Sequence, residues 1–141
     1  MSIQTAVYQK LATDEALQAL LAVSTINPDK PAIYEIWAPQ DTPMPYINLS
    51  YSTSEANHWA KRNTAFYVDI FSDQDSTQAE AIKNRVLKIL DRQRIQLEND
   101  HKARVYSDRD GMVTEPAPGV VHWEMTFSLI YWRKTFIEHL S

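Results

Sequence analysis

A strict alternation of apolar and polar residues near the C-terminal end constrains this chain more than any other feature. The alternation covers residues 121–131, and its apolar members are Val121, Trp123, Met125, Phe127, Leu129 and Tyr131. Its polar members are His122, Glu124, Thr126 and Ser128. Because successive side chains of a strand point to opposite faces, this pattern predicts a long strand with one apolar and one mostly polar face.

Two further segments alternate with the same period. The first covers residues 46–51, and the second covers residues 65–71, with Phe66, Val68 and Ile70 on one face. We expect these strands to pair antiparallel. The connection over residues 52–64 is polar apart from Trp59 and too long for a tight hairpin, so we expect a loop that projects from the sheet.

Shorter strands are expected on both sides of these segments. Residues 33–37 fit a short edge strand, although residues 27–45 hold five of the seven prolines and cannot form a continuous helix. The apolar spacing in residues 95–97 and 103–105 indicates two more short strands. Residues 107–119 collect aspartate, glycine and proline, which predicts a loop.

Helical spacing of apolar residues marks the N-terminal arm and one later segment. In the arm, residues 3–11 form one amphipathic helix, and Thr13 is the expected N-cap of a second helix that buries Leu17, Leu20 and Leu21. The later helix follows a cluster of cap formers at residues 72–76 and continues to Arg92. Its buried positions are Ala79, Ile82, Val86, Ile89 and Leu90.

The order of these elements is helix, helix, strand, strand, helix and strands. This order predicts an α+β fold with a mainly antiparallel sheet and helices packed on one face. A length of 141 residues fits a single compact domain, residues 1–141, that ends in a C-terminal tail at about residues 133–141.

Composition excludes several classes of protein. The chain has no cysteine, so it cannot hold a disulfide, a thiolate nucleophile or a cysteine-ligated zinc ion. Lys and Arg number 14 against 18 Asp and Glu, a net charge of −4, which disfavours general binding to nucleic acid. The first residues lack a signal-peptide pattern, and no apolar run is long enough to span a bilayer. We therefore expect a soluble, unsecreted protein without a membrane or a sequence-specific nucleic-acid partner.

No catalytic, cofactor or metal site is expected from the motifs. The four histidines, His58, His101, His122 and His139, are dispersed, and none forms the i, i+4 pair of helical zinc sites. His122 and Glu124 form an H-x-E pair, but the deaminase motif also requires P-C-x-x-C. We expect these two side chains to be solvated or to form a cross-strand ion pair.

The remaining acidic and glycine-containing segments have structural interpretations. Asp73 and Asp75 precede a helix, where aspartates commonly cap amides, so capping is favoured over paired acid–base chemistry. Residues 108–111 lack the ligand spacing of a calcium loop. Gly111 and Gly119 are the only glycines, so the glycine-rich phosphate-binding motifs are absent.

Large apolar side chains outside the predicted core indicate an interface. Trp59 lies in the polar connection, and the C-terminal tail has more large side chains than a free terminus needs. Docking of the tail on its own core and contact with another subunit both remain open. The candidate interface residues are Trp59, Lys61, Arg62, Trp132, Phe136, Ile137 and Leu140.

The ordered series of motifs resembles a known family. The series consists of the helical arm ending in Leu20 and Leu21, MPYINL at residues 44–49, FYVDIFS at 66–72, the helix from QAEAI at 78–82 to Leu90, and HWEMTF at 122–127. In this order and spacing, over about residues 3–132, the chain is similar to the small tail-completion or tail-terminator (head–tail joining) proteins of long-tailed phages and prophages.

The resemblance implies a structural role without an active site or cofactor. Such proteins assemble as a ring, often hexameric, at the head-proximal end of the tail tube, where they terminate tail growth and join the tail to the neck. The implied partners are further copies of the chain, the tail tube protein and the neck or head-completion proteins. The implied location is the virion tail or neck, after assembly in the host bacterial cytoplasm.

Two other functions remain open on the residues alone. One is a small enzyme with a cleft between helices and sheet, in which His122, Glu124 and a tyrosine would be the acid–base groups. The other is an intracellular adaptor that binds a peptide along a free sheet edge. A pocket that converges on those side chains would favour the enzyme, and a stable monomer with an exposed edge would favour the adaptor.

Overall fold

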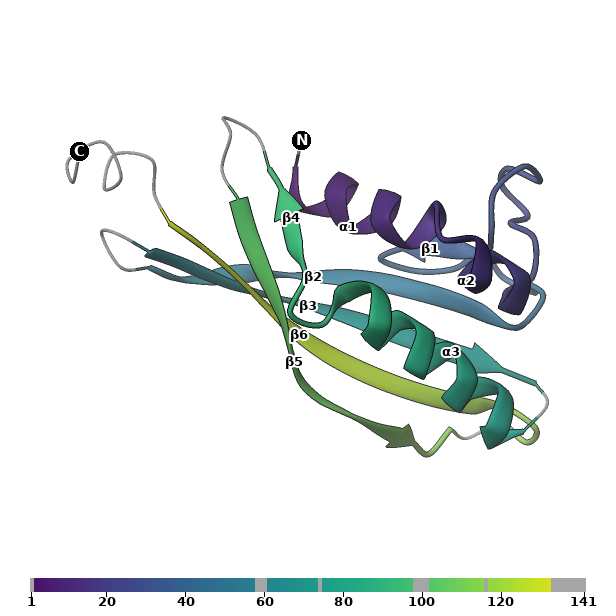
Figure 1. Ribbon diagram of the computed structural model, residues 1–141. Helices are drawn as coiled ribbons and strands as arrows, with labels where there is room; N and C mark the ends of the chain where they lie inside the picture. The colour runs from purple at the N-terminus through teal and green to yellow at the C-terminus, as the bar shows by residue number, and fades with distance from the viewer. Residues whose placement is uncertain (1, 58–60, 74, 98–101, 116, 133–141) are drawn as a thin grey trace.

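Within the described residues, one six-stranded sheet has the strand order β1-β2-β3-β6-β5-β4 (Figure 1). The computed structural model describes residues 2–57, 61–73, 75–97, 102–115 and 117–132. The strands are β1 (Ile33–Glu35), β2 (Tyr46–Asn57), β3 (Lys61–Ser72), β4 (Arg94–Gln96), β5 (Lys102–Val113) and β6 (Val121–Trp132). All neighbouring strands are antiparallel except β1 and β2, which are parallel.

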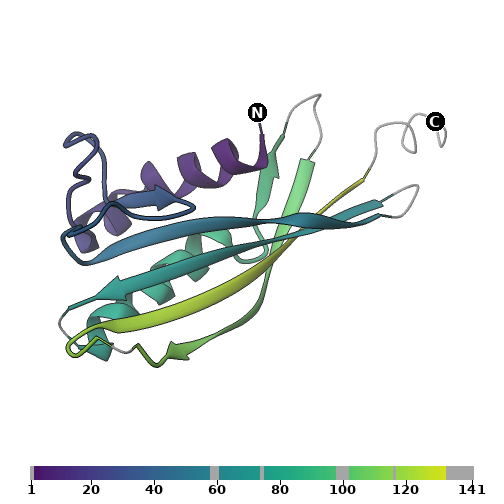
Figure 2. The same cartoon turned by 180° about the vertical axis from the view of Figure 1, so that it is seen from behind.

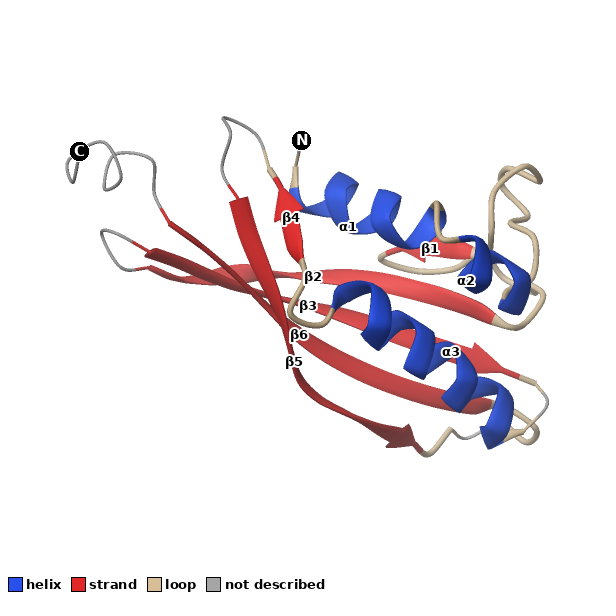
Figure 3. Ribbon diagram, viewed as in Figure 1, coloured by secondary structure: helices blue, strands red, loops and turns tan. Residues whose placement is uncertain are grey.

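In the part of the chain that the structure describes, three helices cover one face of this sheet and leave the other face open (Figures 2 and 3). They are α1 (Ile3–Ala12), α2 (Glu15–Leu20) and α3 (Ser76–Leu90). None of the helices in the described part of the chain is long and apolar enough to cross a membrane. The predicted α+β class, with a mainly antiparallel sheet and helices on one face of a single compact domain, is confirmed.

The core lies between the helices and the covered face of the sheet. Phe66 of β3 and Phe127 of β6 are register partners, fully buried and stacked with 5.1 Å between ring centroids. Leu11, Leu17 and Ile82 close the core from the helices without exposed surface. Burial of each such side chain stabilises the fold by roughly 1.5–3 kcal/mol. The predicted alternation of β6 is confirmed, because Met125, Phe127 and Leu129 are fully buried.

Of the predicted helix caps, Asp75 is confirmed at α3, whereas Asp73 is not the N-cap and the cap predicted for α2 is wrong. Asp75 caps α3, where its carboxylate accepts a hydrogen bond from the Gln78 amide at 3.1 Å, as predicted. The predicted cap Thr13 is wrong, because Thr13 ends α1 and its hydroxyl donates to the Gln9 carbonyl at 2.7 Å. Asp14 caps α2 instead, since its backbone is extended and its carboxylate accepts from the Leu17 amide.

The predicted loop over residues 52–64 is wrong. Strands β2 and β3 continue to Asn57 and from Lys61, and they stay paired up to Asn57 and Arg62 after an irregularity between Tyr51 and Glu55. β6 also pairs with β3 as far as Lys61 and Trp132. Backbone pairing on both sides of β3 therefore maintains the strand where its sequence has become polar.

The predicted loop over residues 107–119 is wrong in its first half. β5 continues through Val113 because β6 offers it a long partner, and an irregularity between Ser107 and Arg109 absorbs the poor local strand propensity. The described residues between Val113 and Val121 lie outside strands, as expected, and Gly119 has a positive φ of 80°. The predicted edge strand at residues 33–37 is confirmed in β1, which is shorter and ends at Glu35.

Candidate functional site

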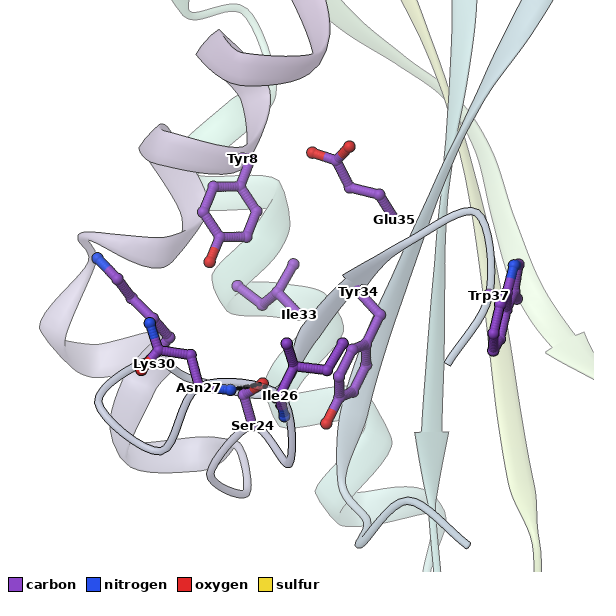
Figure 4. Close-up of a pocket in the computed structure, with 9 residues that line it drawn as sticks. All are labelled: Tyr8, Ser24, Ile26, Asn27, Lys30, Ile33, Tyr34, Glu35 and Trp37. Atoms are coloured by element: carbon purple, nitrogen blue, oxygen red, sulfur yellow. Dashed lines mark hydrogen bonds between the residues drawn. The ribbon is translucent and has the colours of Figure 1, made fainter. Parts of the chain in front are cut away.

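The β1 edge of the sheet presents a group of exposed apolar side chains. We define the β1-edge patch as Ile26, Ile36 and Trp37, whose side chains are 73%, 72% and 69% exposed. A cavity of about 240 Å³ lies beside this patch. Figure 4 shows that Tyr8 of α1, the segment before β1 and β1 itself supply its walls. The cavity is lined by both apolar groups and two opposite charges, Lys30 and Glu35.

The backbone at the end of β1 fixes the position of this patch. Ile36 has a φ of +71°, in the left-handed region that a β-branched residue rarely adopts. Its amide donates to the Leu49 carbonyl at 2.6 Å, and its carbonyl accepts from the Asn48 side-chain amide at 3.0 Å. These bonds to β2 hold the strained residue in place while its side chain faces solvent.

The opposite edge of the sheet presents a second group of exposed apolar side chains. We define the β5-edge patch as Met112 and Val113, and Met112 is 56% exposed. β4 pairs with residues 102–104 of β5, and Val105 and Ser107 are hydrogen-bonded to residues 91–93, so residues 108–113 form the described edge of the sheet. Asp108, Arg109 and Asp110 are exposed along this edge before the patch. Such charges hinder indiscriminate edge pairing.

Three of the seven predicted interface residues lie together at the other end of the long strands. Lys61 pairs with Trp132, and Arg62 pairs with both Asn57 and Tyr131. We call the end of the sheet formed by Asn57, Lys61 and Trp132 the distal end (Figure 1). Trp59, Phe136, Ile137 and Leu140 lie outside the described residues.

A polar cluster occupies the open face of the sheet. His122 of β6 is only 9% exposed, and its Nε2 lies 2.7 Å from the Asp69 carboxylate of β3. Its Nδ1 bonds to Glu115, and its ring stacks on Phe71 at 4.3 Å between centroids. Glu124 lies on the same face, and one ligand atom from each of Asp69, His122 and Glu124 lies within 4.8 Å of the others.

Like charges face each other in this cluster. Asp69 and Glu124 are direct register partners across β3 and β6. Desolvation by burial raises the pKa of Asp69 above its usual range, and the carboxylates of Glu124 and Glu115 add to the rise against the hydrogen bond from His122. Glu124 makes no hydrogen bond or ion pair to any residue that the structure describes.

The cluster agrees in part with the expectation for His122 and Glu124. The two side chains share a face, and His122 forms a cross-strand ion pair with Asp69 of β3, but His122 is nearly buried and also bonds to Glu115. The sequence reasoning missed Asp69 and Glu115. The alternation of residues 65–71 places Asp69 on the polar face of its strand, but it does not give the strand register that brings Asp69 next to His122. His58, His101 and His139 lie outside the described residues.

Comparison with known proteins identifies the family. The model of the family described as tail completion protein gp17 matches residues 5–131. The chain belongs to this family. The resemblance to tail-completion proteins predicted from the ordered motifs is therefore confirmed, and the chain is a structural protein of a phage tail.

Solved structures share the fold of this tail completion family member. A chain from the virion of a native gene transfer agent particle matches with a TM-score of 0.74 at 18% identity, over 94% of this chain and 96% of that chain. A second solved structure matches with a TM-score of 0.58 at 13% identity, over 93% of both chains. At such low identities these similarities establish the fold alone. No curated protein sequence matches this chain.

Proposed function

We propose that this protein forms a homo-oligomeric ring at the head-proximal end of the tail tube, terminates tail growth and joins the tail to the neck. The observation that carries the proposal is the pair of exposed apolar patches on opposite edges of one sheet. Two different surfaces on opposite sides of a subunit favour a head-to-tail contact, and such contacts close into rings when the rotation between subunits permits.

The two patches have features that suit them to each other. The β1-edge patch borders a cavity of about 240 Å³, and the β5-edge patch offers Met112, an unbranched side chain that adapts to irregular apolar gaps. Lys30 and Glu35 line the cavity, while Arg109 and Asp110 precede Met112 on the other edge. Opposite charges are thus available on both surfaces to set the register of the contact.

The net charge and the fold similarity support the proposed position of the ring in the virion. The net charge of −4 gives weak attraction for phosphate, which suits a ring through which DNA passes. The fold is similar to that of a chain from a gene transfer agent virion. We infer that the ring is a hexamer and that it is assembled in the host bacterial cytoplasm. Its partners would be the tail tube and the neck or head-completion proteins. We infer no enzymatic role, no sequence-specific nucleic-acid partner and no membrane partner.

We propose that the distal end contacts the tail tube or a neighbouring subunit. The candidate residues for this contact are Trp59, Lys61, Arg62, Trp132, Phe136, Ile137 and Leu140. The domain then ends near Trp132, and residues 133–141 act as a tail.

The mass of the protein in solution tests the ring. We expect light scattering after size exclusion to give a species near six times 16.3 kDa, with rings in electron micrographs of the same peak. Met112→Asp or Trp37→Asp should each reduce this mass, because each places a charge in one patch. Ala81→Asp, at an exposed position on α3, is the matched control and should leave the mass unchanged.

The mass measurement can also refute the ring. A wild-type monomer that persists at high concentration and in the presence of purified tail tubes would refute the ring and favour an adaptor with an exposed edge. Trp59→Ala and truncation after Lys134 address the distal end in the same mixture with tail tubes. If neither change alters stability, oligomer mass or attachment to tubes, the distal-end contact is wrong.

A further inference from the structure

The polar cluster on the open face has no part in the proposed ring. It lies on β3, β6 and the segment before β6, whereas the two apolar patches lie at the sheet edges. A structural protein gains little from placing Asp69 directly opposite Glu124, because like charges in a cross-strand pair destabilise a sheet. The arrangement therefore calls for a positive partner.

We propose that Asp69, His122 and Glu124 bind a divalent transition-metal ion of the zinc class. One ligand atom from each residue lies within 4.8 Å of the others. Zinc binds imidazole nitrogen and carboxylate oxygen at about 2.0–2.2 Å, which places neighbouring ligand atoms of a tetrahedral site about 3.3 Å apart. Binding of the ion therefore requires the Asp69 carboxylate to move away from Nε2, which lies 2.7 Å from it.

His122 is oriented as a metal ligand would be. Its Nδ1–H can donate to Glu115, its Nε2 lies 2.7 Å from the Asp69 carboxylate, where the ion would replace the shared proton, and the Phe71 ring stacks on the imidazole with 18° between the ring planes. A carboxylate that holds the second nitrogen of a ligating histidine is a common feature of zinc sites. Glu115 is thus a positioning residue, and Asp69, His122 and Glu124 are the ligands.

The charge balance favours a cation at this point. Three carboxylates, Asp69, Glu115 and Glu124, surround one imidazole, so the cluster keeps excess negative charge even when the imidazole is protonated. Glu124 is half-buried and has no hydrogen-bond or ion-pair partner in the described part of the chain. A divalent ion supplies that partner and also relieves the repulsion between Glu124 and Asp69.

The donor set selects the class of ion. Calcium and magnesium prefer all-oxygen sites, whereas an imidazole nitrogen with two carboxylates suits zinc, cobalt, nickel and similar ions. Three protein ligands leave a fourth position for water or for a donor from another molecule. The metal would tie β3 to β6 and to the segment that contains Glu115.

Titration of the untagged, metal-stripped protein with Zn²⁺ and Co²⁺ tests the proposal. We expect calorimetry to give one Zn²⁺ per chain and Co²⁺ to give the visible absorption of a four-coordinate site. Glu124→Gln is the decisive variant, because its side chain is isosteric and has no partner to lose. It should retain the fold, weaken Zn²⁺ binding at least tenfold and remove the Co²⁺ absorption.

Matched variants separate this site from incidental binding. Glu80→Gln, at an exposed position on α3, and His139→Gln should leave the stoichiometry and affinity unchanged. Glu115→Gln should weaken binding by about 10–100-fold, as the loss of a carboxylate behind a ligating histidine does. The absence of Zn²⁺ heat and of Co²⁺ absorption in the wild type, or unchanged affinity in Glu124→Gln, would overturn the proposal and leave an ion-pair network.

Discussion

Backbone strain at a single residue supports the proposal that the β1-edge patch is an interface. Ile36 adopts a φ of +71° although its β-branched side chain disfavours that conformation, and its side chain gains almost no burial in return. Such a residue costs of order 1–3 kcal/mol of stability. In a monomer nothing offsets this loss of stability, whereas in an assembled subunit burial of the Ile36 side chain against its neighbour offsets it.

Replacement of Ile36 should therefore change stability and assembly in opposite directions. In a Met112→Asp background, which blocks assembly, we expect Ile36→Gly to raise the free energy of unfolding by about 1 kcal/mol, because glycine accepts a positive φ. In the otherwise wild-type chain, the same change should weaken self-association. Urea denaturation and light scattering measure the two effects.

Ile36→Val is the control for this prediction, because valine keeps both the β-branch and most of the apolar surface. It should leave stability and association close to the wild type. If Ile36→Gly destabilises the monomer, the strain at this position is smaller than the entropy that glycine adds to the unfolded chain.

At the scale of elements, one carboxylate joins α2 to α3. Asp14 caps α2 through the Leu17 amide at 2.9 Å and also accepts two hydrogen bonds from the Arg85 guanidinium of α3, at 2.6 and 2.8 Å. The hydrogen bonds from Arg85 are the main cause that holds the pKa of Asp14 below its usual range. The short helix α2 thus depends on a charged partner from a distant part of the chain.

The depressed pKa fixes the pH dependence of this link. A carboxylate with a lowered pKa in the folded state contributes stability above its unfolded value of about 3.9, and this stability is lost as the pH falls through the folded pKa. We expect Asp14→Asn to be less stable than the wild type at pH 7, and the difference to shrink as the pH approaches 3. Asp14→Ala should cost about 1 kcal/mol more, because it also loses the cap.

Urea denaturation between pH 3 and 7 measures this difference. Asp73→Asn removes the same charge from an exposed position and should show no comparable change. A gap between wild type and Asp14→Asn that stays constant with pH would mean that the ion pair with Arg85 adds nothing to stability.

The elements that could be predicted from sequence are those in which the spacing of apolar side chains reflects a buried face. The alternation of β6 and the helical spacing of α3 gave their positions because each buries one face. The outer halves of β2, β3 and β5 could not be predicted, since they are strands through pairing with neighbours and not through apolar periodicity. Asp69 was missed for a related reason, because alternation assigns a face but not a register.

At the scale of the whole molecule, the two edge patches differ in kind. The β1-edge patch borders a cavity, and the β5-edge patch follows an open strand edge, so a two-fold symmetric contact would leave one of them uncovered. A head-to-tail contact covers both on every subunit only when the assembly closes. This distinction separates a ring from a simple dimer by experiment.

Mixing of two assembly-deficient variants makes that distinction. Trp37→Asp damages only the β1-edge patch and Met112→Asp damages only the β5-edge patch, so each variant alone should remain monomeric. A mixture retains one intact surface from each chain and should form a heterodimer that cannot grow, with a mass near twice 16.3 kDa. Light scattering of the mixture, compared with each variant alone, measures this species. A two-fold symmetric contact would use one patch on both subunits, so the variant that keeps that patch would dimerise on its own. A mixture that stays monomeric would refute the head-to-tail arrangement.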